Sequence, residues 1–469
     1  MKKITIFTLF LTLFLVSSLY SQQTVWVIAG GTGDGTSQGN AFGNMTDALV
    51  QIDSAGDVLR VVGTITPGSQ TLAKTFAYTI EGDTGGSTLN GVTGVGRMFT
   101  INGASVGQNV TFKNITFSGQ ISSIAAGGAI LYSNQTGVTI NFQNCRFVGN
   151  SLTSAVTTGG GALWFTNSTV TITDCLFKEN QALQNGGAIA INNTSNVTMT
   201  GCTFYKNSTT GITQSFGGGA LYVNGAAAVV TIDHCTFFEN NIGHPNQDYG
   251  TIRSDNGNTT IKNSLFYGNK VKNITDPDPA NHFLAGPSDW GSSGNGIQTF
   301  SYSIGQWITS NIDNRSNFIS FVKGGLDPLA AANLTSSNLR FDDIPSSPTY
   351  GKVIYDAVAA GTNSPIDFGD DGADAGAWDS GLTLSVKDNE FAANFSVSYN
   401  AQTKNLKVLR SNEDSVSLEI YNLMGSKVLF RKNASKEENI SASSLQSGVY
   451  ILVAKGSGNK SFSQKFVIN

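Results

Sequence analysis

Residues Thr169–Asn180 read TVTITDCLFKEN, and the same pattern of residue types recurs along the middle of the chain. The well-preserved copies are Thr139–Asn150, Thr169–Asn180, Asn196–Asn207, Val229–Asn240 and Asn258–Asn269. A worn copy precedes them at Asn109–Gly119. The phenylalanines that they share follow one another by 30, 30, 27, 33 and 29 residues, and are Phe117, Phe147, Phe177, Phe204, Phe237 and Phe266. A period near 30 residues without helical spacing predicts a solenoid.

Each unit is expected to contain a bend. Val170, Ile172 and Cys175 cannot share one face of a straight strand, because alternation breaks after Ile172. A bend at the intervening position would restore the inward direction. That position holds residue types that tolerate a left-handed backbone, namely Asn114, Asn144, Asp174, Gly201, His234 and Asn263. The pattern therefore predicts short parallel strands in stacked coils, at least six of them across residues 109–269, about 4.8 Å apart.

Stacked coils would align equivalent residues into columns. The asparagines that end each unit are expected to form an amide ladder, and they are Asn150, Asn180, Asn207, Asn240 and Asn269. All four cysteines share one position, and they are Cys145, Cys175, Cys202 and Cys235. In a parallel stack their Cβ atoms lie farther apart than a disulfide prefers, and no Cys-x-x-Cys motif exists. We expect buried thiols rather than disulfides or a metal site, although exported proteins often do pair their cysteines.

The Gly-Gly-Ala-Ile and Phe-x-x-Asn signatures resemble the repeats of chlamydial polymorphic outer-membrane proteins and related bacterial adhesins. That resemblance implies a right-handed parallel β-helix of the pectin-lyase-like type over residues 22–380. The start, with a strand at Thr24–Ile28 and a short capping helix at Met45–Ile52 after Asn44, is similar to that of many secreted β-helix proteins. Residues 364–378 resemble a closing motif of such proteins, with one residue missing. Residues 270–345 lose the repeat, and we expect irregular coils there.

The end of the chain has a different pattern. Alternating strands and Gly-containing turns over residues 386–469 predict a small β-sandwich, so the fold class is all-β throughout. Ile420–Gly425, Leu445–Tyr450 and Lys465–Asn469 resemble the C-terminal sorting domain of type IX secretion in Bacteroidota. This implies handling by the type IX machinery and a secreted or cell-surface location. Met1–Ser21 has the charged start and apolar run of a secretory signal, and we expect no transmembrane segment in the mature chain.

Composition excludes one class of partner. Only 13% of the residues are charged, and Gly accounts for 54 of 469. Residues 22–385 carry 15 Lys/Arg against 25 Asp/Glu, a net charge of −10, whereas residues 386–469 carry 11 against 7, or +4. An acidic main domain without a basic stripe argues against nucleic-acid binding.

Residues that could perform chemistry are sparse. His244, Asp248 and Arg253 gather in one spacer and the next strand, where they are weak candidates for the base and cation of a polysaccharide lyase. His234 falls in the bend column and is expected to be structural. An acidic loop could hold calcium, although a solvated turn is the simpler interpretation, and it contains Asp367, Asp370, Asp371 and Asp374. We expect no other cofactor or metal.

An outward-pointing column offers a binding surface instead. The residue after each Gly-Gly-Ala-aliphatic segment should face away from the core, and this column reads Leu131, Trp164, Ala190, Tyr222 and Arg253. Trp164, Tyr222 and Arg253 are the candidate ligand-binding residues, with a shallow seat above Ala190. The same residues are also explained as ordinary side chains on the surface of a strand, without a binding role.

The favoured function is an adhesin-like or glycan-binding module that recognises an extracellular glycan or surface protein. The alternative is a polysaccharide lyase or glycoside hydrolase.

Overall fold

A computed structural model describes residues 22–271 apart from 85, 95, 102–106, 125–126, 155–158, 212–216 and 244–249. It also describes 290–291, 297–301, 304–307, 314–316, 319–322, 339–342, 344, 347 and 350–355. The last described part is 395–468 apart from 401–403, 411–415, 423–426, 433 and 456–460. The chain divides into two compact units, and the second begins its main part at Thr383.

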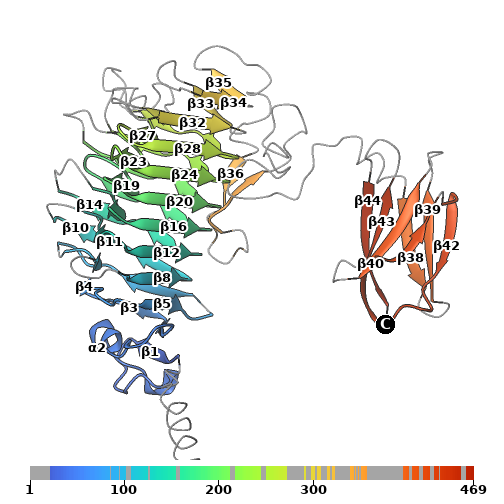
Figure 1. The fold of residues 1–469 in the computed structure, drawn as a ribbon, viewed down its shortest axis with the longest axis horizontal. Helices are drawn as coiled ribbons and strands as arrows, with labels where there is room; N and C mark the ends of the chain where they lie inside the picture. Colours follow the sequence, from blue (N-terminus) through green and yellow to red (C-terminus); the bar gives the residue numbers. More distant parts are fainter. Residues whose placement is uncertain are drawn as a thin grey trace, which may run out of the picture. The chain divides into compact units, whose positions relative to one another are not determined.

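The first unit is a parallel β-helix whose strands form four sheets (Figure 1). Sheet A contains β1 Thr24–Ile28, β2 Val58–Val62, β5 Ala77–Gly82, β8 Asn109–Lys113, β12 Thr139–Gln143, β16 Thr169–Thr173, β20 Asn196–Thr200, β24 Val229–Asp233, β28 Asn258–Lys262, β32 Ile297–Ser301 and β34 Asn314–Ser316. Sheet B contains β3 Thr64–Ile65, β6 Ser87–Asn90, β9 Ile115–Ser118, β13 Arg146–Val148, β17 Leu176–Lys178, β21 Thr203–Tyr205, β25 Thr236–Phe238, β29 Leu265–Tyr267, β33 Ile304–Trp307 and β35 Ile319–Val322.

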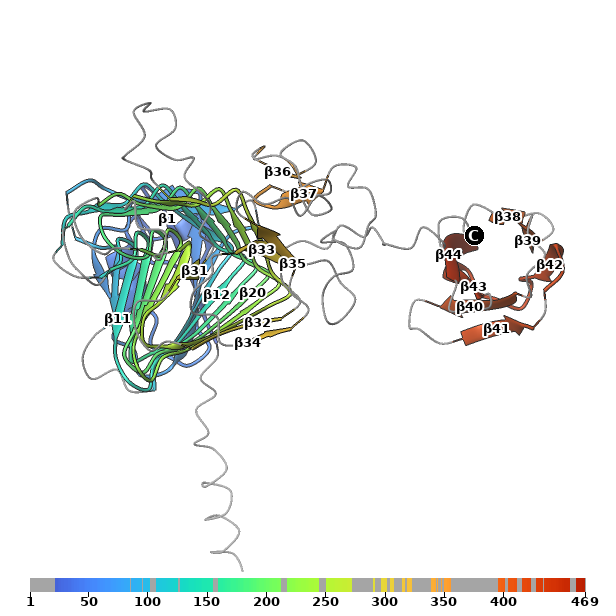
Figure 2. The same ribbon diagram turned by 90° about the horizontal axis from the view of Figure 1, so that it is seen from above.

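The other two sheets complete each coil. Sheet C contains β4 Gln70–Thr71, β7 Phe99–Ile101, β11 Leu131–Asn134, β15 Leu163–Thr166, β19 Ile189–Asn192, β23 Leu221–Asn224, β27 Ile252–Ser254 and β31 Trp290–Gly291. Sheet D contains β10 Ile121–Ser122, β14 Ser151–Leu152, β18 Gln181–Ala182, β22 Ser208–Thr209, β26 Asn241–Ile242 and β30 Lys270–Val271. Figure 2 looks along the stack and shows the strands arranged around a common interior.

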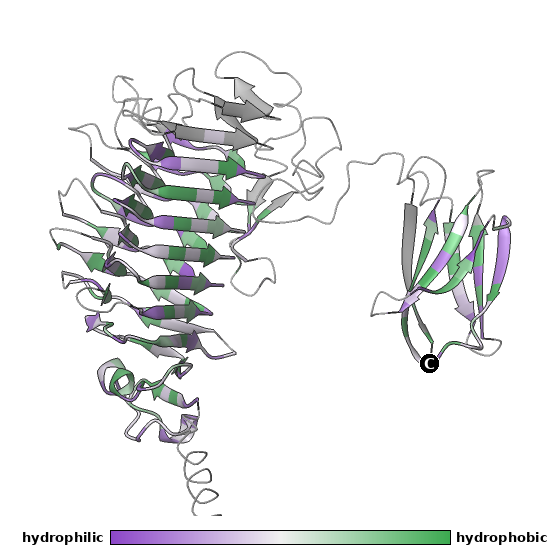
Figure 3. Cartoon of the chain, viewed as in Figure 1, coloured by the Kyte–Doolittle hydropathy of each residue, from purple (hydrophilic) through white to green (hydrophobic). Residues whose placement is uncertain are grey.

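The predicted register is confirmed. The six units between residues 109 and 269 supply β8, β12, β16, β20, β24 and β28, which pair in parallel without a shift. All six predicted bend residues have positive φ, between 48° at His234 and 65° at Gly201. The bend turns the chain from sheet A to sheet B, so that apolar side chains of both sheets point inward. Figure 3 shows the resulting alternation of apolar and polar residues along the strands.

The interior is built from the predicted columns. Phe177 is fully buried and stacks on Phe147 at 4.6 Å and on Phe204 at 4.8 Å between ring centroids. All four cysteines are buried and free, as predicted. The asparagine ladder is confirmed as well: the Asn180 amide donates to Oδ1 of Asn207 at 3.0 Å and to the Phe147 carbonyl at 2.8 Å. Each rung satisfies backbone groups that the turn would otherwise leave unpaired.

The N-terminal end of the stack is covered by the short helix α2, Met45–Val50, as Figure 1 shows. Asn44 caps it, since its side chain accepts a hydrogen bond from the backbone N–H of Asp47. Met45 and Ala48 are buried in the same core as the first strands, so the helix hides the apolar end of the β-helix. A 3-10 turn, η1 at Gln38–Asn40, lies in the Gly-rich loop before it.

The expectation of irregular coils after residue 270 was wrong for part of that region. Strands β32 and β34 continue sheet A, and β33 and β35 continue sheet B, all in parallel pairing. Backbone pairing continues there without the side-chain signature, because hydrogen bonding between parallel strands does not depend on residue type. The chain then forms an antiparallel hairpin, β36 Leu339–Phe341 with β37 Val353–Tyr355. Among the described residues, no helix is long and apolar enough to cross a membrane.

The second unit has two antiparallel sheets around one apolar core, as expected of a β-sandwich. One sheet contains β38 Phe395–Asn400, β39 Asn405–Arg410 and β42 Glu437–Ser441. The other contains β41 Lys427–Arg431, β40 Ser417–Asn422, β43 Gly448–Lys455 and β44 Ser461–Ile468. Leu406 and Ile440 from the first sheet pack with Ile420 and Leu452 from the second.

The C-terminal unit is expected to lose stability in acid because of Glu419. Its carboxylate accepts a hydrogen bond from the Tyr421 hydroxyl and lies 3.1 Å and 3.0 Å from the Nζ atoms of Lys427 and Lys455. These hydrogen bonds, the one from Tyr421 foremost, lower the pKa of Glu419 from 4.5 to about 2. A carboxylate whose pKa is lower in the folded state than in the unfolded state stabilises the folded state. That contribution is fully present above the unfolded-state pKa, and it is lost as the pH falls from there towards the folded-state pKa.

Thermal unfolding of the full chain between about pH 5 and pH 2.5 would measure this loss as a fall in the melting temperature of the C-terminal unit. Glu419→Gln should give a lower melting temperature at neutral pH and a flatter dependence across the same window. An equally steep acid dependence in this variant would show that other groups control it.

Candidate functional site

The sequence-predicted outward column is present, with one correction. Trp164 pairs with Ala190, Ala190 with Tyr222 and Tyr222 with Arg253 in successive strands of sheet C. The position before Trp164 belongs to Tyr132, whereas the Gly-Gly-Ala-aliphatic motif predicted Leu131 there. The backbone N–H of Ile130 donates to the Ala162 carbonyl, and the N–H of Ala162 donates to the Ala188 carbonyl. Ile130, not Ala129, is therefore the structural equivalent of Ala162, and the pairing in this unit is shifted by one residue from the alignment of the motifs. Leu131 therefore lies in the core.

The column is covered rather than open. Trp164 is 9% exposed and Tyr222 is 5% exposed, and Ala190 between them has no exposed surface. The seat expected above Ala190 is therefore closed. The Trp164 ring stacks on Tyr132 at 4.6 Å between centroids, and the Arg97 guanidinium lies 4.5 Å from the Tyr132 ring centre. These side chains pack against one another in a cluster on the outer face of sheet C.

Arg253 is also held in place. Its guanidinium lies 2.7 Å from Oδ2 of Asp255 and 5.5 Å from the ring centre of Tyr222. The Tyr222 hydroxyl donates to the same carboxylate at 3.2 Å, and burial, followed by the charge of Asp255, raises the Tyr222 pKa above its ordinary value. His244 and Asp248 lie outside the described residues, so the lyase constellation stays a prediction. The acidic loop from Asp367 to Asp374 also lies outside them.

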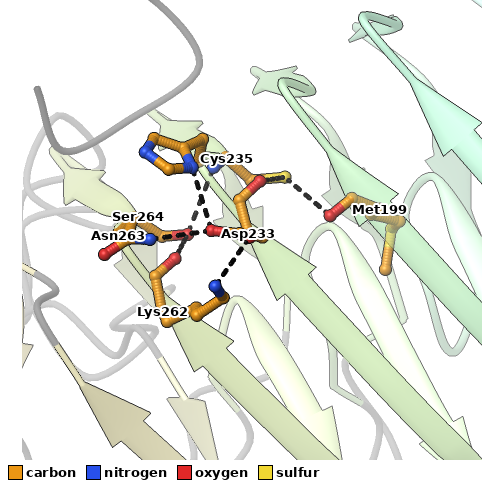
Figure 4. Close-up of polar contacts among 7 residues, drawn as sticks. Met199, Asp233, Cys235, Lys262, Asn263 and Ser264 are labelled. Atoms are coloured by element: carbon orange, nitrogen blue, oxygen red, sulfur yellow. Dashed lines mark hydrogen bonds and ion pairs between the residues drawn. The ribbon is translucent and has the colours of Figure 1, made fainter. Parts of the chain in front are cut away.

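His234 belongs to a polar cluster at the bend after β24. The Asp233 carboxylate lies 2.9 Å from Nδ1 of His234 and 3.0 Å from Nζ of Lys262. It also accepts a hydrogen bond from the side-chain amide of Asn263 at 2.9 Å. Figure 4 shows Lys262 and Asn263 reaching Asp233 from the next coil, with the backbone of Cys235 close by. The cluster ties two coils together at the corner between sheets A and B, in agreement with the structural role expected of His234.

A polar groove follows the same corner over earlier coils. It consists of two adjoining pockets that share Asn144 and Arg146. The wider pocket, about 520 Å³, is lined by Asp83, Thr84, Gly86, Asn114, Ile115, Thr116, Asn144 and Arg146. The narrower one, about 240 Å³, is lined by Asn144, Arg146, Asp174, Cys175, Leu176, Thr203, Tyr350, Gly351 and Lys352. We call the whole feature the corner groove.

Part of the groove's lining comes from positions that the repeat pattern fixes. Asn114 and Asn144 are bend residues whose positive φ turns their amides outward, and the Asn144 amide donates to Oδ1 of Asn114 at 2.9 Å. Arg146 points outward from β13, with its guanidinium 4.7 Å from the ring centre of Tyr350. Tyr350 and Lys352 come from the hairpin about 200 residues later in the chain, which no local pattern could place here. The amides were visible in the bend column, but nothing marked them as part of a groove.

The groove offers hydrogen bonds more readily than acid–base chemistry. It presents amides, which donate and accept, together with two cations, two carboxylates and an aromatic ring. The carboxylates of Asp83 and Asp174 lie at bends three coils apart, roughly 14 Å at 4.8 Å per coil. Paired carboxylates in glycoside hydrolases lie roughly 5–9.5 Å apart. Within the part of the chain that the structure describes, no three His, Cys, Asp or Glu side chains gather to hold a metal ion.

Comparisons with known proteins identify the C-terminal unit. Residues 397–469 match the family described as a secretion system C-terminal sorting domain, so the chain carries a type IX sorting domain. Among solved structures, the chain is similar to a rhamnogalacturonan lyase, at 12% identity over 71% of this chain and 97% of that chain, with a TM-score of 0.29. A likeness at this level carries no argument about activity or substrate. No curated protein matches the sequence.

Proposed function

We propose that this protein, which type IX secretion exports to the cell surface or the extracellular space, binds a glycan there through its corner groove. The observation that carries the proposal is the lining of that groove. Amides, cations and carboxylates line an extended recess of two adjoining pockets, and an aromatic ring from the hairpin stands beside Arg146. A glycan presents hydroxyl groups that both donate and accept, and apolar ring faces that stack on aromatic side chains. The groove supplies a partner for each.

The rigidity of the groove supports the same function. Its walls are stacked coils tied together by the asparagine ladder and by ring stacking, so the backbone positions that carry the polar groups are set before a ligand arrives. Preorganised groups lose less conformational entropy on binding. The predicted platform of Trp164, Tyr222 and Arg253 is a weaker candidate, because those side chains are at least 91% covered and already engaged with one another.

Arg146→Ala is expected to weaken glycan binding while leaving the fold intact. Hydrogen bonds to a charged group contribute about 1.5–3 kcal/mol, which corresponds to roughly 10- to 150-fold in Kd. Retention of the full-length protein on immobilised cellulose, chitin, xylan and mannan, by affinity electrophoresis, would measure the effect.

Arg60→Ala is the matched control. Arg60 also lies over an aromatic ring, that of Trp26 at 5.8 Å, but on the outer face of sheet A, and it is not among the residues that line the groove. Its replacement should not change retention. Equal retention of Arg146→Ala and the parent protein would refute the groove as the binding site. Failure of the parent protein to bind any of these polymers would argue against a glycan partner.

A further inference from the structure

We propose that the corner groove binds the end of a glycan chain rather than its interior. This inference rests on the proposed function and adds the mode of recognition. It follows from the way in which the groove narrows, becomes covered and stops beneath the β36–β37 hairpin.

The groove narrows in one direction. The pocket beside Asp83 and Asn114 has a volume of about 520 Å³, and the pocket beyond Arg146 has about 240 Å³. Pockets for drug-sized ligands usually measure roughly 300–1,000 Å³. The inner pocket is therefore of a size to receive one small unit, such as a single sugar ring, whereas the outer pocket has room for more of the chain.

Exposure falls in the same direction. The bend residues Asn144 and Asp174 are exposed, but the next one, Gly201, is buried. On sheet B, Arg146 is partly exposed, whereas Leu176 on the next coil is 5% exposed and Thr203 on the one after is 1% exposed. The equivalent residues of the two following coils, Thr236 and Leu265, are buried as well. At this position sheet B is therefore covered from Leu176 onward, so we expect a chain lying along the groove to end at Thr203.

The hairpin forms the closed end. Gly351 approaches sheet B so closely that a Cβ there would lie 3.0 Å from a methyl group of Leu176, and its φ of +87° disfavours any other residue. Beyond the inner pocket, Phe341 of the hairpin stacks on Tyr205 with the ring centroids 3.8 Å apart. Tyr205 is two residues along β21 from Thr203, so this aromatic pair covers sheet B beside the inner pocket.

One polar group that lines the closed pocket, the Thr203 hydroxyl, is buried without a hydrogen-bond partner among the described residues. Buried polar groups in native proteins are nearly always paired, so an orphan that lines a pocket points to a ligand. A sugar hydroxyl can both donate to and accept from Thr203, and Asp174 and Lys352 line the same pocket. These groups suit the additional hydroxyl that only the terminal unit of a glycan carries.

Binding stoichiometry distinguishes the two modes. The full-length protein would be titrated by calorimetry with cello-, chito-, xylo- and manno-oligosaccharides of increasing length, and with the soluble polymer of whichever series binds. If the groove binds chain ends, the affinity should rise with oligosaccharide length only until the groove is filled. The polymer should saturate at one protein molecule per chain. Saturation in proportion to polymer mass would overturn end binding while leaving glycan binding in place. Binding of no series would overturn both proposals.

Thr203→Val tests the closed pocket in the same assay. It should weaken binding of the oligosaccharide roughly tenfold without lowering the melting temperature, because the lost hydroxyl has no partner in the free protein. Thr203→Ser should restore binding, and Thr171→Val, on the exposed face of sheet A, should have no effect. Unchanged affinity in Thr203→Val would show that the ligand does not reach the inner pocket.

Discussion

Replacing Phe177 by alanine is expected to lower the free energy of unfolding of the β-helix by about 3–5 kcal/mol, as for other buried aromatic truncations. Phe177 has no exposed surface, and its ring is stacked between those of Phe147 and Phe204. The rings above and below are held by their own coils, so they cannot collapse into the space. The cost should therefore include the cavity as well as the lost burial.

Chemical denaturation monitored by circular dichroism would measure this loss. Thr171→Ala is the control, because Thr171 lies on the exposed face of β16 in the same coil. Its effect should stay within about 0.5 kcal/mol. A loss below about 1 kcal/mol for Phe177→Ala would contradict the central place that the phenylalanine column holds in the core.

Deletion of residues 386–469 is expected to abolish delivery to the cell surface or medium. The deleted segment contains residues 397–469, which match the sorting domain, whereas the predicted signal at Met1–Ser21 remains. The truncated protein should therefore accumulate in the periplasm, and fractionation followed by immunodetection would locate it. The full-length Arg146→Ala variant provides the control, since it alters the groove and keeps the sorting domain. Surface exposure of the truncated protein at the level of the parent would show that the signal lies elsewhere.

The repeat made most of the β-helix predictable. Each structural role is tied to one position of the repeat and to a narrow set of residue types: a left-handed bend at Asp174, an inward ring at Phe177 and an amide rung at Asn180. These are local requirements that recur in every coil, so comparison of the copies reveals them. The sorting domain was predictable for a different reason, since its strands and its motifs at Ile420–Gly425 and Leu445–Tyr450 are close in sequence.

The candidate site was predicted less well. Alternation correctly indicated that Trp164 and Tyr222 leave the core, but it gives no information about what covers the outer face of a sheet. The corner groove depends on contacts between segments far apart in the chain, such as Arg146 with Tyr350. The hairpin carries no repeat signature, and its position depends on tertiary packing that a periodic pattern does not encode.

The free cysteine column constrains the order of events during export. The bacterial periplasm is oxidising, and a chain that remains unfolded there would expose four thiols able to form disulfides with one another. Any such bond would link coils in a geometry that the native stack does not allow. Once the coils have closed, all four thiols are buried, and burial is the largest cause that raises the pKa of Cys175 and of Cys235. Thiols buried in this way are inaccessible to an oxidant. Productive secretion therefore requires that the coils stack before the cysteines are oxidised. A chain that forms disulfides first would be held covalently in a non-native arrangement.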